Sequence, residues 1–129
     1  MAHILLIEDS GDYADIVAFY LKSSGFTVTS IRDGRQGLDA ARAGGVDLII
    51  TDLMLPSLNG YEICSLLKQD SRYQRIPIMI LTASKLQTKD RELALQCGAD
   101  AFCAQSTEPK QLLERIQALL NASASASSS

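Results

Sequence analysis

The chain has 129 residues, of which 47% are hydrophobic and 21% charged, and its formal net charge is −3 at pH 7. This is the composition of one ordinary globular domain, large enough to bury a core without disulfides or metals. Direct nucleic-acid binding is disfavoured because the basic residues are scattered rather than gathered into a cationic surface. No apolar run is long enough to span a membrane, and the N-terminus lacks the basic start of a signal peptide, so we expect a cytoplasmic location and no membrane contact.

The three cysteines are an odd number and show no CxxC spacing. A disulfide framework or a zinc site normally requires paired or clustered cysteines. We therefore expect reduced thiols, as is usual in the cytosol, at Cys64, Cys97 and Cys103.

The hydrophobic pattern alternates between short apolar runs and segments of helical periodicity. The runs predict strands over residues 4–7, 26–31, 46–51, 78–81 and 101–104. The periodic segments predict helices over residues 12–23, 34–43, 60–68, 88–96 and 108–120, with Ser10 and Asn59 as N-caps of the first and third. In the first helix, the apolar positions at helical spacing are Ile16, Val17, Tyr20 and Leu21.

Five strands that alternate with five helices predict an α/β fold with a parallel sheet covered on both faces. Right-handed connections leave few topologies, and we expect a three-layer, doubly wound, flavodoxin-like (βα)5 sheet with strand order 2-1-3-4-5. The domain is predicted over residues 2–120. Residues 121–129 are nearly all Ala and Ser and are predicted to form a flexible tail or linker.

Polar residues follow three of the apolar runs: Glu8 and Asp9 the first, Asp52 the third and Thr82 the fourth. Carboxyl ends of parallel strands share one edge of the sheet, so these side chains are expected to converge there. Each residue alone could be a helix cap or a solubilising loop residue. Together, three carboxylates would repel one another unless a cation joined them, and such an oxygen-only cluster suits Mg²⁺. Asp52 could then act as a nucleophile toward a phosphoryl group.

Four motifs resemble those of the response-regulator receiver domains of two-component signalling, both the stand-alone chemotaxis regulators and the receivers of DNA-binding regulators. They are Ile7-Glu8-Asp9, Asp52-Leu53-Met54-Leu55-Pro56 with Gly60, Leu81-Thr82-Ala83, and Gly98-Ala99-Asp100. The resemblance covers residues 2–120. It implies that Asp52 is the phosphoacceptor, and that Mg²⁺ is held by Glu8 through water, by Asp9, by Asp52 and by the backbone carbonyl of Met54.

The resemblance also implies roles for the residues around the phosphoryl group. Thr82 matches the switch hydroxyl, Ala83 follows it in the same motif, and Phe102 matches the aromatic ring that swings inward when the hydroxyl moves. Met54 and Ser84 match two variable positions that influence how quickly water removes the phosphoryl group. The expected phosphodonor is a sensor histidine kinase or a phosphotransfer protein.

The sequence departs from the family pattern at the end of the fifth strand. The family has a Lys-Pro pair with a cis bond, and this chain has Gln105-Ser106. A neutral donor in place of an ammonium group weakens the hold on a phosphoryl group by about 1–2 kcal/mol. Without the proline, a cis bond would cost about 2.5–4 kcal/mol, so we predict a trans Gln105–Ser106 bond and a rearranged loop.

Two readings of this departure stay open. Asp52 is still phosphorylated and the signal passes through an altered switch, or the domain is a pseudo-receiver that binds partners without phosphate control. We favour the first because the metal ligands and the nucleophile are all present. A haloacid-dehalogenase-type phosphatase would need a second acid where Met54 stands, and a flavodoxin would need a Ser/Thr-rich loop in place of Glu8-Asp9-Ser10-Gly11.

In either reading the chain is expected to signal by binding rather than by turning over a substrate. The resemblance places the downstream partner on the face of the last two helices and the last strand. Several charged positions of the family's dimer network are uncharged here, among them Gln96, Cys97 and Gln111, so a monomer is expected. Whether the chain is a stand-alone regulator or part of a longer one stays open.

Overall fold

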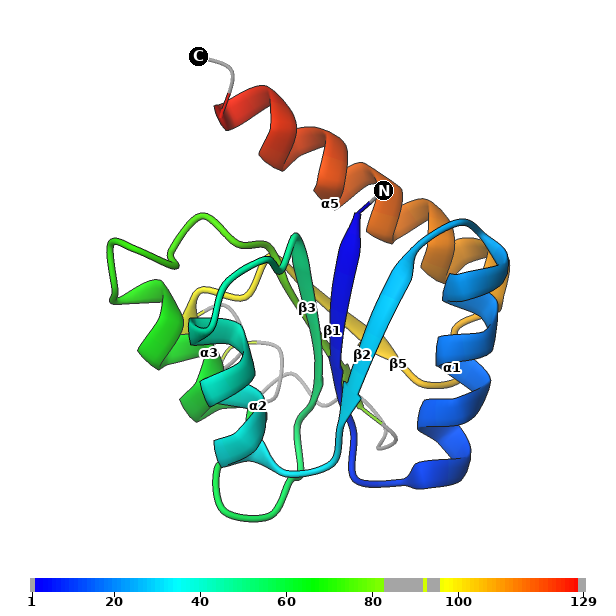
Figure 1. Cartoon of the computed structure of the whole chain (residues 1–129), viewed down its shortest axis with the longest axis horizontal. Helices are drawn as coiled ribbons and strands as arrows, with labels where there is room; N and C mark the ends of the chain where they lie inside the picture. The colour runs from blue at the N-terminus through cyan, green and yellow to red at the C-terminus, as the bar shows by residue number, and fades with distance from the viewer. Residues whose placement is uncertain (1, 83–91, 93–95, 128–129) are drawn as a thin grey trace.

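The computed structural model of the chain describes residues 2–82, 92 and 96–127. Its centre is a five-stranded parallel sheet in the order β2-β1-β3-β4-β5, which confirms the predicted topology (Figure 1). The strands are β1 (His3–Ile7), β2 (Thr27–Ile31), β3 (Leu48–Asp52), β4 (Ile78–Thr82) and β5 (Ala101–Ala104).

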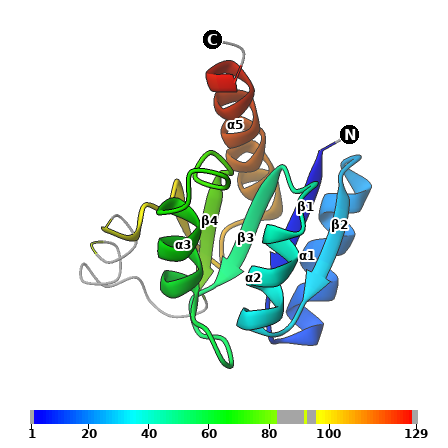
Figure 2. The same ribbon diagram turned by 60° about the vertical axis from the view of Figure 1, so that its left-hand side comes forward.

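Helices cover both faces of the sheet, as the two views show (Figures 1 and 2). Helix α1 (Gly11–Ser23) and α5 (Pro109–Ser127) lie on one face, and α2 (Gly34–Arg42) and α3 (Gly60–Lys68) lie on the other. The predicted helix 88–96 falls mostly outside the described residues. Of the residues in and just after it, Glu92, Gln96 and Cys97 are helical.

The N-caps that fix two of the helices agree with the sequence. Ser10 Oγ accepts a hydrogen bond from the backbone N–H of Tyr13 over 3.4 Å. Asn59 forms a capping box with Glu62, in which each side chain accepts from the other's backbone N–H, over 2.9 and 3.2 Å. These caps define where the chain turns into a helix directly after β1 and after the loop that follows β3.

The buried face of α1 contains only some of the apolar positions named from the sequence. Val17 and Leu21 are buried, whereas Ile16 is 55% exposed and Tyr20 is 41% exposed. The face that packs on the sheet consists of Ala14, Val17, Ala18 and Leu21. These four positions follow the i, i+3, i+4, i+7 spacing, and the alanines let the helix approach the sheet closely, whereas Ile16 and Tyr20 lie on the opposite side.

The last helix is longer than predicted. It continues through Ser127 rather than ending at Leu120, so residues 121–127 are helical. Alanine has the highest helix propensity and this segment contains neither Gly nor Pro, so nothing in it stops the helix. In the part of the chain that the structure describes, no helix combines the length and apolarity needed to cross a bilayer.

Candidate functional site

Strand register brings the predicted acidic residues together at one edge of the sheet. Ile7 in β1 pairs with Thr51 in β3, so Glu8 and Asp52 follow aligned positions on neighbouring strands. Asp9 comes one residue later. Carboxylate oxygens of Glu8, Asp9 and Asp52 all lie within 4.8 Å of one another. The structure thus gathers three acidic side chains into one group, as the sequence predicts.

Glu8 is the most unusual member of this group because this acidic residue is only 3% exposed. Its Oε2 has no hydrogen-bond partner among the described residues. Burial, together with the nearby Asp52 and the negative charge of Asp9, raises the pKa of Glu8 to about 8. A buried carboxylate oxygen without a donor is rare in proteins, and a cation beside it would both supply its partner and cancel the repulsion.

Asp52 is half-buried and held at the end of β3. Its Oδ1 accepts a hydrogen bond from the backbone N–H of Leu53 over 2.7 Å. Burial raises the pKa of Asp52, while the interaction with Glu8 and this backbone bond act in the opposite direction. The carboxyl group is therefore fixed in orientation yet remains open to solvent, as a nucleophile requires.

The loop after β3 packs tightly behind Asp52. The N–H of Gly60 donates to the carbonyl of Leu53 over 3.0 Å, which brings the start of α3 against the end of the strand. A Cβ at residue 60 would lie 2.5 Å from the carbonyl oxygen of Asp52. Only glycine allows this approach, so Gly60 helps to position the acidic side chain.

Gln105 lies at the same edge, just beyond β5. Its backbone N–H donates to the carbonyl of Thr82 over 2.8 Å, and its side-chain Nε2 donates to Glu8 Oε1 over 3.1 Å. The sequence predicts a neutral donor here in place of lysine, and the structure directs that donor to a carboxylate of the acidic group. No peptide bond in the described residues is cis, which confirms the predicted trans Gln105–Ser106 bond.

The remaining predicted site residues lie in or after β3, β4 and β5, or fall outside the described residues. Thr82 ends β4 and is 2% exposed, and Phe102 is half-buried in β5 beside Ile80. Met54 is 73% exposed. Ala83 and Ser84 lie outside the described residues.

Tyr13 belongs to the surroundings of the site, although the sequence gives no motif that points to it. Its hydroxyl donates to the carbonyl of Gln105 over 3.5 Å. Burial and the negative charges of Glu8 and Asp52 raise the pKa of Tyr13 to about 12. The one available signal is its place in the first turn of the helix that follows the acidic pair.

Comparison with known proteins gives a consistent result. Residues 4–117 match the response regulator receiver domain family. The chain is 39% identical over 117 residues to the DNA-binding response regulator MtrA of Mycobacterium tuberculosis. It is 41% identical over 120 residues to the response regulator ArlR of Staphylococcus aureus. These alignments cover 91% and 93% of this chain but 50% and 53% of those proteins, so the chain spans about half the length of these relatives.

Solved structures show the same architecture. The receiver domain of a Pseudomonas aeruginosa sensor histidine kinase, solved with a magnesium ion in its active-site cleft, superimposes with a TM-score of 0.85 at 32% identity. The alignment covers 93% of this chain and 98% of that one. The receiver domain of a Syntrophus aciditrophicus histidine kinase gives a TM-score of 0.87 at 30% identity, and it covers 95% of this chain and 92% of the other.

Proposed function

The chain belongs to the response regulator receiver domain family, and on this premise we propose that Asp52 accepts a phosphoryl group from a histidine kinase or a phosphotransfer protein. As a receiver domain, it is a signalling module of a two-component system. The observation that carries the assignment to Asp52 is its fixed, solvent-reachable carboxyl within 4.8 Å of the oxygens of two further acids. An isolated surface aspartate would have neither the fixed orientation nor the acidic neighbours.

The residues of this group fit a magnesium ion. Glu8, Asp9 and Asp52 offer only oxygen ligands, which Mg²⁺ prefers. The buried Oε2 of Glu8 accepts no hydrogen bond from the described residues, so a cation could serve as its partner. We assign the ion to these three carboxylates and to the backbone carbonyl of Met54, with Glu8 acting through water. When bound, Mg²⁺ would neutralise charge on the reacting oxygens.

The chain's own residues set up the transfer. The N–H of Leu53 holds Oδ1 of Asp52, and the N–H of Gly60 binds the carbonyl of Leu53, which joins the start of α3 to the end of the strand. A carboxylate oxygen of Asp52 attacks phosphorus, the new O–P bond replaces the P–N bond of the donor, and the histidine leaves. Orientation before the reaction lowers its entropic cost.

The response to phosphorylation is assigned to residues around the same edge. Thr82, Ala83 and Phe102 are proposed as the switch, Gln105 as a neutral donor in the place of lysine, and Met54 and Ser84 as residues that set the lifetime. The downstream partner would bind a face that includes β5 and α5; the helix predicted over residues 88–96, which the sequence adds to this face, lies mostly outside the described residues. We further propose a cytoplasmic, monomeric domain that turns over no separate substrate.

The experiment is phosphorylation of the whole chain by acetyl phosphate with and without Mg²⁺, followed by intact mass. We expect Mg²⁺-dependent addition of one phosphoryl group, lost in Asp52→Asn. Asp39→Asn, which changes an exposed acid on α2, is the matched control and should leave the addition unchanged. A wild-type chain that never gains the phosphoryl group would instead support the pseudo-receiver reading.

A further inference from the structure

A second group of reactive side chains lies away from the acidic edge, where the segment before β5 packs against α3. Cys64 in α3 is fully buried, and its Sγ donates a hydrogen bond to the backbone carbonyl of Cys97 over 3.4 Å. Cys97 ends the helical residues 96–97 and is half-buried. The two cysteines are far apart in the sequence, so the fold itself brings them together.

Two further observations show how closely this segment approaches α3. Gly98 has a φ of 90°, and a Cβ at this position would lie 3.1 Å from Cγ of Lys68 in the last turn of α3. In addition, the pKa of the Cys64 thiol lies above its usual range, first because of burial and then because the Cys97 side chain interacts with it. The side chains of Cys64 and Cys97 therefore lie next to each other.

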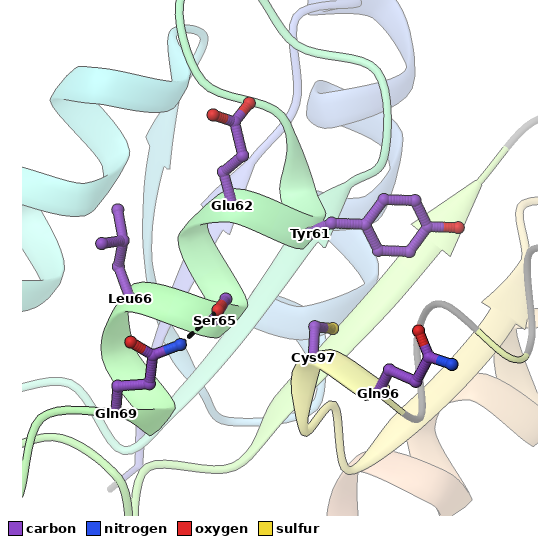
Figure 3. A pocket seen from close by; sticks show the side chains of 7 residues that line it. All are labelled: Tyr61, Glu62, Ser65, Leu66, Gln69, Gln96 and Cys97. Carbon is purple, nitrogen blue, oxygen red and sulfur yellow. Dashed lines mark hydrogen bonds between the residues drawn. The ribbon is translucent and has the colours of Figure 1, made fainter.

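The two cysteines differ in their access to solvent. Cys97 lines a surface pocket of about 510 Å³ between α3 and residues 96–97, together with Tyr61, Ser65 and Leu66. Figure 3 shows its side chain rising from this segment beside α3. Cys64 is 0% exposed. A small reagent can reach Cys97 from the pocket, whereas it cannot reach Cys64 directly.

We propose that Cys64 and Cys97 form a disulfide when the protein meets a hydroperoxide, so that residues 96–98 become covalently joined to α3. The Cys97 thiolate attacks the peroxide, the O–O bond breaks, and Cys97 becomes a sulfenic acid while an alcohol or water leaves. The sulfur of Cys64 then attacks the sulfenic sulfur, the S–O bond breaks, and the departing hydroxide takes the Cys64 proton and leaves as water. Two thiols together lose two electrons, and the hydroperoxide gains them.

The surroundings support this order of steps. Cys97 is the more accessible of the two thiols, and exposure is one of the properties that decide which thiol is oxidised first. Cys64 keeps its proton, because burial raises the pKa of its thiol despite the nearby positive charge of Lys68, and this proton leaves with the departing hydroxide. Residues 96–98 precede β5, so the disulfide would link the segment before this strand covalently to α3.

Cys103 is not a competing partner. It is buried in the core on the other face of the sheet, among residues of α1 and α5, and its Sγ accepts a hydrogen bond from Nη1 of Arg115 over 3.2 Å. Cys64 and Cys97 both belong to the face covered by α2 and α3. The sheet therefore separates Cys103 from the pair, which makes it an internal control.

The test treats the reduced whole chain with hydrogen peroxide, blocks the remaining thiols and maps the peptides by mass spectrometry. We expect a Cys64–Cys97 cross-linked peptide, a chain lighter by two hydrogen atoms, and a Cys103 that is blocked as a free thiol. Cys103→Ser should leave the cross-link unchanged. In Cys64→Ser, the sulfenic acid at Cys97 should persist and be trapped by dimedone.

Three results would overturn the proposal: Cys97 oxidised to sulfinic acid with Cys64 still reduced, a cross-link that involves Cys103, or a link between two chains. Failure of a variant to fold does not affect the test, because the peptide map of the unaltered chain decides it. Phosphorylation of Asp52 plays no part in the measurement, so the two proposals can fail independently.

Discussion

The side-chain amide of Gln105 donates to Oε1 of Glu8 over 3.1 Å, which places the residue that replaces the family's lysine in contact with an acid of the proposed metal site. This bond favours the charged form of Glu8, against its burial and the neighbouring carboxylates. In the unphosphorylated protein, the Gln105 side chain is thus already hydrogen-bonded to Glu8. An amide is neutral, so it offsets none of the negative charge that phosphorylation would add.

Replacing Gln105 by lysine should therefore stabilise the phosphorylated protein. An ammonium group at this position forms charge-assisted bonds, which contribute about 1–2 kcal/mol more than neutral ones, or roughly a 5–30-fold longer lifetime of phospho-Asp52. The measurement is the decay of the acetyl-phosphate-labelled chain. Gln105→Met, which keeps the length but removes the donor, is the control and should not lengthen the lifetime. Equal decay of the lysine variant and the wild type would show that residue 105 does not act on the phosphoryl group.

Replacing Gly60 by alanine should destabilise the chain and disturb Asp52. The new Cβ would lie 2.5 Å from the carbonyl oxygen of Asp52, which is backbone and cannot move without shifting the strand end. We expect a loss of about 1–3 kcal/mol in the free energy of unfolding, measured by urea denaturation. Gly11→Ala is the matched control: the three atoms nearest to its Cβ would belong to the guanidinium of Arg32, a flexible side-chain end that can move aside. A similar loss in both variants would argue against a special role for the contact at Asp52.

The stability of the metal-free chain should fall as the pH rises from about 4.5 to about 8. In the folded state the pKa of Glu8 is about 8, raised chiefly by burial, against an ordinary value of 4.5. Between these values the unfolded chain ionises Glu8 while the folded chain keeps it protonated, so rising pH favours unfolding, by about 1–3 kcal/mol. Denaturant midpoints across this range, with a chelator present, test the prediction.

Two comparisons identify the source of this pH dependence. Glu8→Gln cannot ionise at residue 8 and should show a flatter profile between these pH values. Saturating Mg²⁺ should stabilise the wild type most at the upper end of the range, where Glu8 is most readily charged. A profile that rises with pH in the metal-free wild type would contradict the assignment.

The sequence predicts the fold well because its signals are local and repeated. Continuously apolar runs such as residues 4–7 mark strands buried on both faces, and polar residues directly after them mark the functional edge. The acids Glu8, Asp9 and Asp52 follow from this rule alone. Whether the three carboxylates lie close together depends on the register of β1 against β3, which the sequence does not specify. The parallel pairing of Ile7 with Thr51 brings them to the same edge of the sheet.

What the sequence could not provide are contacts that depend on side-chain direction. Ile16 and Tyr20 have helical spacing with Val17 and Leu21, yet the small residues Ala14 and Ala18 take the buried positions instead. The contact of Tyr13 with the carbonyl of Gln105 joins residues 92 positions apart and leaves no motif. The helix continues to Ser127, and not into a flexible tail, because the alanines of residues 121–127 have a high helix propensity.

Lys68 is expected to contribute strongly to the stability of the chain. Its Nζ donates to the carbonyls of Gln74 and Ile76 over 3.1 and 2.9 Å and to Oδ2 of Asp100 over 2.8 Å, so it joins the end of α3 to the segments that enter β4 and β5. Its side chain is 16% exposed, so water cannot fully replace these bonds. Lys68→Met keeps the aliphatic stem but leaves Asp100 and two carbonyls short of a donor, and should cost about 2–3 kcal/mol.

Thermal and urea unfolding of Lys68→Met measure this cost. Lys22→Met removes an exposed lysine from the last turn of α1 and should change stability by no more than about 0.5 kcal/mol. Asp100 also accepts from the N–H of Ile78 over 2.8 Å, so Asp100→Asn, which keeps one acceptor oxygen, should lose less than Lys68→Met. If Lys68→Met were no less stable than Lys22→Met, the three bonds of Lys68 would be replaceable by water and would not hold α3 to the sheet.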